Sequence, residues 1–251
     1  MKNFLVLISM FSFFIVFSQE KKFTIQYTLF FAEQDDSGNS EYKKIMAGVY
    51  KKSGQVNFNL YVKDSLSYFI AEDGIDNSNL SYQLALTKPL YSTPLFTNFN
   101  KKEIVSKNSP NFIFFDKNQF LIKRDFISNW EIQSETKVID DKLCYKAVSK
   151  GNNYYHSKGK LINFDVTAWF CPEIPVNAGP VYFNNLPGLI LEISYLDVKL
   201  VATSIKFDVD EKLIKQPTGK ETVSYEEFNK LKEEMLEEKT KQMNEQMRTK
   251  E

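Results

Sequence analysis

The sequence predicts a mainly β fold: a curved antiparallel sheet or half-barrel meander, with a C-terminal α-helix packed on it or extending from it. Three observations favour this fold. Apolar and polar residues alternate over many short segments, turn residues separate those segments, and aromatic residues are abundant. The 251-residue chain contains 22 phenylalanines and 13 tyrosines, whose side chains favour half-buried positions on a pleated sheet.

The first eighteen residues predict a cleavable secretory signal peptide. Lys2 supplies the positive charge, and the uncharged apolar run over residues 4–17 is too short to span a bilayer comfortably. Ser18 places a small side chain before the cut. We therefore expect a mature chain that begins at Gln19 and is exported to the periplasm or the extracellular medium. An uncleaved N-terminal anchor is the alternative.

After the signal peptide at 1–18, residues 19–223 are predicted to form a single antiparallel β domain, because neither a linker nor a repeat divides them. Alternation is clearest in the first strand, where Phe23, Ile25, Tyr27 and Leu29 share one face. Turn chemistry follows at 35–39, and further strands are expected at 56–62, 66–71, 111–115, 130–138, 143–148, 161–170 and 189–193. Residues 88–110 contain three prolines and predict a long irregular connection.

Residues 224–251 change to a helical pattern. Ser224 and Glu227 have the spacing of a capping box, and Val223 and Phe228 that of a hydrophobic staple. We expect the helix to dock on the sheet as far as residue 236. The remaining charged tail is expected to be solvated or frayed, although a partner-binding helix is the alternative.

Charge and composition exclude several classes of partner. The formal net charge is zero at pH 7, which argues against nucleic acid or an anionic membrane held by charge. The mature chain has no apolar run long enough for a transmembrane segment. The single histidine, His156, and two cysteines do not make a spaced ligand set, so we expect neither a metal nor another cofactor.

The two cysteines, Cys144 and Cys171, predict a disulfide, since an exported chain meets oxidising conditions. An antiparallel pairing of residues 143–148 with 164–170 would bring them within reach. Two free buried thiols are the alternative.

Residues 165–193 predict a stiff, proline-braced crossover between two core strands. Pro172, Pro175 and Pro180 cannot donate to a sheet ladder and hold the preceding residues extended. Pro187 and Gly188 form a turn pair before an apolar strand.

This crossover resembles the GLPGLI family of exported proteins from Bacteroidetes. The namesake motif is present as Asn185, Leu186, Pro187, Gly188, Leu189 and Ile190, preceded by Ala168-Trp169-Phe170, Ile174-Pro175 and Gly179-Pro180. Asn185 replaces the first glycine of the motif, and asparagine tolerates the positive φ that the turn requires. The resemblance is good over residues 128–195 and implies export and a β fold, without implying a reaction.

No arrangement of residues predicts catalysis. His156 lies in a polar loop, and motifs for nucleophilic, metallohydrolase or phosphate-binding sites are absent from the sequence. Glu173 and Glu192 could form a carboxylate pair of the glycosidase kind. Hydration of the first and a cross-strand partner for the second are simpler interpretations.

We therefore expect a non-enzymatic envelope protein that binds an apolar ligand (a lipid, lipopeptide or peptide) or a protein partner. The expected rim of the binding face consists of Trp169, Phe170, Ile174, Pro175 and Val176. These side chains could instead belong to the core. The alternative functions are a secreted hydrolase of an envelope or extracellular polymer and a structural subunit of envelope machinery.

Overall fold

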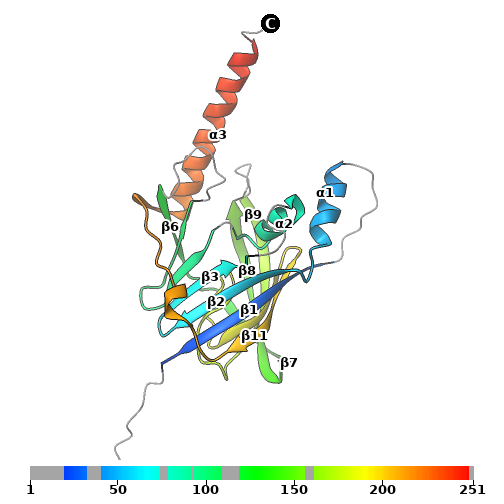
Figure 1. Cartoon of the computed structure of the whole chain (residues 1–251), viewed down its shortest axis with the longest axis vertical. Coiled ribbons are helices and arrows are strands. Elements are labelled where there is room, and N and C mark those ends of the chain that lie inside the picture. Colours follow the sequence, from blue (N-terminus) through cyan, green and yellow to red (C-terminus); the bar gives the residue numbers. More distant parts are fainter. Residues whose placement is uncertain are drawn as a thin grey trace, which may run out of the picture.

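The computed structural model describes residues 20–32, 41–73, 79–91, 93–108, 119–155 and 161–248. Its strands are β1 (Lys22–Phe31), β2 (Val56–Lys63), β3 (Leu66–Ala71), β4 (Leu95–Asn98), β5 (Glu103–Lys107), β6 (Phe120–Asp125), β7 (Trp130–Ile139), β8 (Lys142–Tyr155), β9 (Leu161–Cys171), β10 (Leu189–Tyr195), β11 (Val198–Lys206) and β12 (Glu221–Ser224). They form one open sheet in the order β12-β6-β5-β4-β3-β2-β1-β11-β10-β9-β8-β7 (Figure 1). The predicted mainly β, antiparallel fold is confirmed.

Two meanders make up this sheet. Strands β1 to β6 and strands β7 to β11 each follow one another in space, and an antiparallel pairing of β1 with β11 joins them. In that pairing Leu29 lies opposite Leu200, far away in the sequence. The short strand β12 pairs in parallel with β6 at one edge, and β7 forms the other edge.

The alternation seen in the sequence determines which face of the sheet is buried. Phe23, Ile25, Tyr27 and Leu29 of β1 are all buried, as predicted. Strand β2 buries every second residue in the same way. Aromatic stacking adds to this core, with the rings of Phe58 and Phe69 parallel and 5.2 Å apart between centroids.

Helices α1 (Glu41–Tyr50) and α2 (Leu80–Thr87) were not expected from the sequence. The two helices contact each other so closely that a Cβ atom on Gly48 would lie 2.5 Å from Ser81 Oγ. Asn79 caps α2, since its side chain accepts a hydrogen bond from the Tyr82 backbone N–H at 3.2 Å.

The prediction of an irregular connection over residues 88–110 is wrong for residues 95–98 and 103–107, which are strands. This segment forms β4 and β5, which pair with each other and extend the sheet. Pro94 lies directly before β4, where a missing N–H donor is tolerated. Strand β8 also runs further than predicted, to Tyr155.

The C-terminal helix α3 (Tyr225–Arg248) begins with the predicted capping box. The Glu227 N–H donates to Ser224 Oγ at 3.1 Å, and the Ser224 N–H donates to Glu227 Oε2 at 2.8 Å. Val223 and Phe228 share a small buried cluster with two residues of β6. The helix then extends away from the sheet (Figure 1), with residues 237–242 helical and exposed rather than frayed.

The fold also contains a short helical turn, and several predictions concern residues that are not described. A 3₁₀ turn, η1 (Glu211–Leu213), follows β11. Within the described ranges, no helix is long and apolar enough to cross a membrane. The predicted signal peptide, the turn at 35–39, the strand at 111–115 and His156 lie outside the described residues.

Candidate binding site

The central loop, residues 172–188, connects β9 to β10 and contains neither helix nor strand, as predicted. Two hydrogen bonds attach it to β10: the Leu189 N–H donates to the Ile174 carbonyl at 3.1 Å, and the Ile190 N–H donates to the Ala178 carbonyl at 3.0 Å. Its buried apolar side chains, among them Ile174, Val176 and Leu186, belong to the same cluster as the core residues of β1. The loop therefore fills the apolar side of the sheet.

The six-residue motif places the end of this loop against β9. Asn185 has a φ of +71°, the left-handed conformation that asparagine was expected to tolerate at this turn. Its Nδ2 donates to the Ile127 carbonyl at 3.0 Å. A Cβ atom on Gly188 would lie 2.3 Å from the carbonyl oxygen of Cys171, so only glycine permits this approach. Leu186, Leu189 and Ile190 are buried, and Pro187 is exposed.

The five residues expected at an apolar rim have different surroundings. Phe170, Ile174 and Val176 are buried. Pro175 is exposed. Trp169 is half-buried, with Lys137 Nζ 4.4 Å from the centre of its ring. Three of the five side chains thus contribute to the core, and the central loop covers the face where we expected an apolar ligand.

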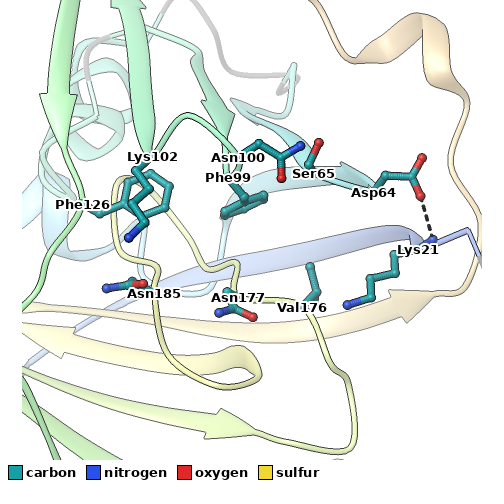
Figure 2. A pocket seen from close by; sticks show the side chains of 10 residues that line it. All are labelled: Lys21, Asp64, Ser65, Phe99, Asn100, Lys102, Phe126, Val176, Asn177 and Asn185. Atoms are coloured by element: carbon teal, nitrogen blue, oxygen red, sulfur yellow. Dashed lines mark hydrogen bonds between the residues drawn. The ribbon is translucent and has the colours of Figure 1, made fainter. Parts of the chain in front are cut away.

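A polar cleft of about 390 Å³ lies between the central loop and two hairpin turns. One wall comes from the β2–β3 and β4–β5 turns, and the other from the loop. The residues lining it, labelled in Figure 2, are Lys21, Asp64, Ser65, Phe99, Asn100, Lys102, Phe126, Val176, Asn177 and Asn185.

Several polar side chains in this cleft have no partner within the described part of the chain. They are Ser65, Asn100, Lys102 and Asn177. Figure 2 shows Lys102 and Lys21 at opposite ends of the lining residues, with Asn177 between them. Lys21 Nζ donates to the Pro175 carbonyl at 2.6 Å, which links the start of β1 to the central loop.

Two phenylalanines supply the apolar part of the cleft. The rings of Phe99 and Phe126 meet edge to face, 5.9 Å apart between centroids. Both are partly buried against the main core, so their position is set by packing. The cleft therefore combines a small apolar surface with polar side chains that have no partner within the described part of the chain.

The sequence did not reveal the cleft residues outside the central loop. Lys102 and Asp64 occupy hairpin turns with positive φ values of +53° and +50°. Such turns can be recognised as turns, but their position opposite the loop depends on the pairing of β1 with β2 and β11.

A second polar cavity, of about 410 Å³, lies on the opposite face of β1, β2 and β11. Some of its polar groups are paired: Gln26 Nε2 donates to Glu72 Oε2 at 3.2 Å, and Asp208 and Asp210 each accept a backbone N–H within their own turn. Other lining side chains have no hydrogen-bond partner within the described part of the chain, as in the first cleft; they are Asn59, Ser204 and Lys206. We regard the first cleft as the candidate site because the central loop, which carries the six-residue motif, forms one of its walls.

The two cysteines are free in this structure, so the predicted disulfide is not formed in it. The pairing that we expected between their strands is confirmed: Tyr145 lies opposite Phe170, which places Cys144 and Cys171 at the next pair of positions. Both are buried. Burial, with a smaller effect of Cys171, raises the pKa of the Cys144 thiol to about 12.

The two glutamates considered as catalytic partners are in different settings. Glu192 Oε1 forms an ion pair with Lys137 Nζ at 2.7 Å, which is the cross-strand partner of the simpler interpretation. Glu173 is exposed. Within the described ranges no hydrogen bond joins the two, and no group of three or more histidine, cysteine, aspartate or glutamate side chains is suited to hold a metal ion.

Comparisons with known proteins connect the central loop to a family. A family model described as a protein of unknown function (Porph_ging) matches residues 156–192, which include all of β9, the loop and the start of β10. The search of curated proteins found no match.

Two crystal structures of a protein named PNGF-II are similar to this chain in fold. Their TM-scores are 0.51 and 0.52 at 14% sequence identity, over 84% and 85% of this chain. The matched region is 32% and 33% of the PNGF-II chain. This chain thus spans about a third of the length of PNGF-II, and at this identity the similarity concerns the fold alone.

Proposed function

We propose that this protein is an exported, non-enzymatic binding protein that holds a polar ligand in the cleft between the central loop and the β2–β3 and β4–β5 turns. The observation that carries the proposal is the group of unpaired polar side chains around Asn100, Lys102 and Asn177. These side chains are exposed and hydrated, and because no other group of the protein holds them they are available to bind a ligand in the cleft.

The filled apolar side of the sheet supports a polar ligand over an enclosed lipid. Ile174 and Val176, which could have framed an apolar cavity, are buried in the core.

Export, membership of the GLPGLI family and a Cys144–Cys171 disulfide are part of the same proposal. The signal-peptide pattern at residues 1–18 supports export. The match of an uncharacterised family model over residues 156–192 supports the family. The opposed, buried cysteines support a disulfide in an oxidising compartment.

Native mass spectrometry tests the binding role. The protein is purified gently from its own host as the wild type, as Asn177→Trp, which fills the cleft, and as Lys241→Trp, a matched change on the exposed part of α3. We expect a bound mass or a bound partner in the wild type and in Lys241→Trp that is lost in Asn177→Trp. An identical bound species in all three proteins, or none in the wild type, would contradict the proposal.

A further inference from the structure

Two lysines of the cleft, Lys21 and Lys102, form no ion pair within the described part of the chain. Lys102 Nζ has no acceptor within the described part of the chain, and Lys21 Nζ donates only to the neutral Pro175 carbonyl. An ammonium group has three N–H donors, so Lys21 keeps donors for a ligand. Asp64 also lines the cleft, beside Lys21 (Figure 2), and its carboxylate accepts the Lys21 backbone N–H at 3.2 Å. Two lysines against one aspartate leave the lining with one net positive charge, which favours a ligand that carries carboxylates.

The amides between the lysines match a peptide backbone. A side-chain amide carries the same donor and acceptor groups as a peptide unit and can pair with one through two hydrogen bonds. Asn100 and Asn177 are exposed and come from opposite walls of the cleft. A chain lying between them could bond to both walls.

The aromatic part of the cleft favours a peptide over a saccharide. Stacking of a sugar ring needs a broad, exposed aromatic face, but Phe99 and Phe126 pack edge to face and are half-buried. Their remaining surface suits one apolar side chain.

We infer that the ligand of the cleft is an acidic peptide segment of a protein partner, held by Lys21 and Lys102 at its carboxylates and by Asn100 and Asn177 along its backbone. This inference depends on the proposed function, because it names the ligand of the same site. Since the lysines are exposed, binding falls as salt screens the charges.

Fluorescence anisotropy with short labelled peptides tests this inference. The probe peptide alternates glutamate with serine around one central phenylalanine, and its control carries glutamine in place of glutamate. The proteins are the wild type, Lys102→Glu, Asn177→Trp and the matched surface change Lys241→Glu, each checked by circular dichroism for its fold. We expect the glutamate peptide to bind more tightly than the glutamine peptide, and Lys102→Glu to weaken it by about fivefold or more. Lys241→Glu should bind like the wild type.

The other outcomes separate the inference from the proposed function. Equal binding of both peptides, lost in Asn177→Trp but unchanged in Lys102→Glu, would overturn the acidic ligand and keep the cleft. If a carboxylated oligosaccharide binds at the cleft and neither peptide binds, the acidic-peptide inference is overturned but the cleft remains a binding site. The proposed binding cleft and the acidic-peptide inference both fail if every probe binds Asn177→Trp as tightly as the wild type. They also fail if no probe binds the wild type.

Discussion

Replacing Gly188 by alanine probes the contact that holds the central loop against β9. At this residue φ is +156°, a conformation that side-chain-bearing residues rarely adopt. A Cβ atom there would lie 2.3 Å from the carbonyl oxygen and 2.6 Å from the carbonyl carbon of Cys171. Because these are backbone atoms of β9, no side-chain rotation relieves the overlap.

The cost of this substitution can be estimated from the two effects. Overpacking in a closed site costs about 1–3 kcal/mol, and a positive φ adds about 1–2 kcal/mol for alanine. The lower entropy of the unfolded alanine chain offsets about 0.4–1 kcal/mol. We expect the free energy of unfolding to fall by about 1–5 kcal/mol, which lowers the Tm by about 2–20 °C for a chain of this size.

Urea denaturation and thermal circular dichroism measure this loss. The control is Gly151→Ala, where φ is also positive, at +70°, but the nearest atom to the new Cβ is a side-chain nitrogen 3.8 Å away. The control therefore isolates the cost of the backbone conformation. If the two variants lose the same stability, the close approach of the loop to β9 is wrong.

Three further predictions concern the start of α3, the Lys137–Glu192 ion pair next to Trp169, and the two cysteines. Ser224→Ala should lower the free energy of unfolding by about 1 kcal/mol, because the Glu227 N–H loses its acceptor. The hydrogen bond from the Ser224 N–H lowers the pKa of the Glu227 carboxyl. The stabilisation from that second bond is therefore present above the ordinary glutamate pKa and is lost as pH falls through the lowered value. Lys137→Met should cost about 1–3 kcal/mol, because the Glu192 side chain is only 17% exposed and loses its partner. In the reduced protein the two buried thiols should resist a thiol reagent at neutral pH until urea unfolds the protein, and oxidative refolding should remove the mass of two hydrogen atoms.

Each of these expectations has a control and a contradicting result. A Glu227→Gln variant should remove the acid dependence at α3, and an unchanged pH profile would contradict the capping account. Adding Glu192→Gln to Lys137→Met should restore stability, whereas Lys123→Met at a more exposed ion pair should cost less. Rapid thiol modification of the native protein would show that the cysteines are accessible.

The sequence predicted those parts of the fold whose signal is local. Alternation over β1 identified its buried face, because side chains on a strand point to opposite sides in turn. The start of α3 was predicted from Ser224 and Glu227, because a capping box satisfies its donors within four residues.

Elements that depend on distant contacts were missed. Helix α1 has a single buried residue, Val49, and α2 buries Tyr82 and Ala85, so neither shows a broad apolar face. The two helices pack against each other at Gly48, and a contact between two separate segments cannot be read from the sequence of either one. Strands β4 and β5 are too short to show a clear period among the prolines of residues 88–110.

The candidate site was only partly predictable for the same reason. The prolines and the motif indicated a stiff central loop, and Asn185 and Val176 do line the cleft. Apolar residues of a loop can, however, face a ligand or the core, and the sequence cannot separate the two. Lys21 and Lys102 reach the cleft only because the sheet brings their turns to the loop.

Nuclear magnetic resonance of the side-chain amides tests the binding cleft most directly. Titration of ¹⁵N-labelled protein with the glutamate peptide should shift the amide signals of Asn100, Asn177 and Asn185, while that of Asn59 in the cavity on the opposite face stays unchanged. Shifts confined to Asn59 and its neighbours, with the three cleft amides unmoved, would contradict the account.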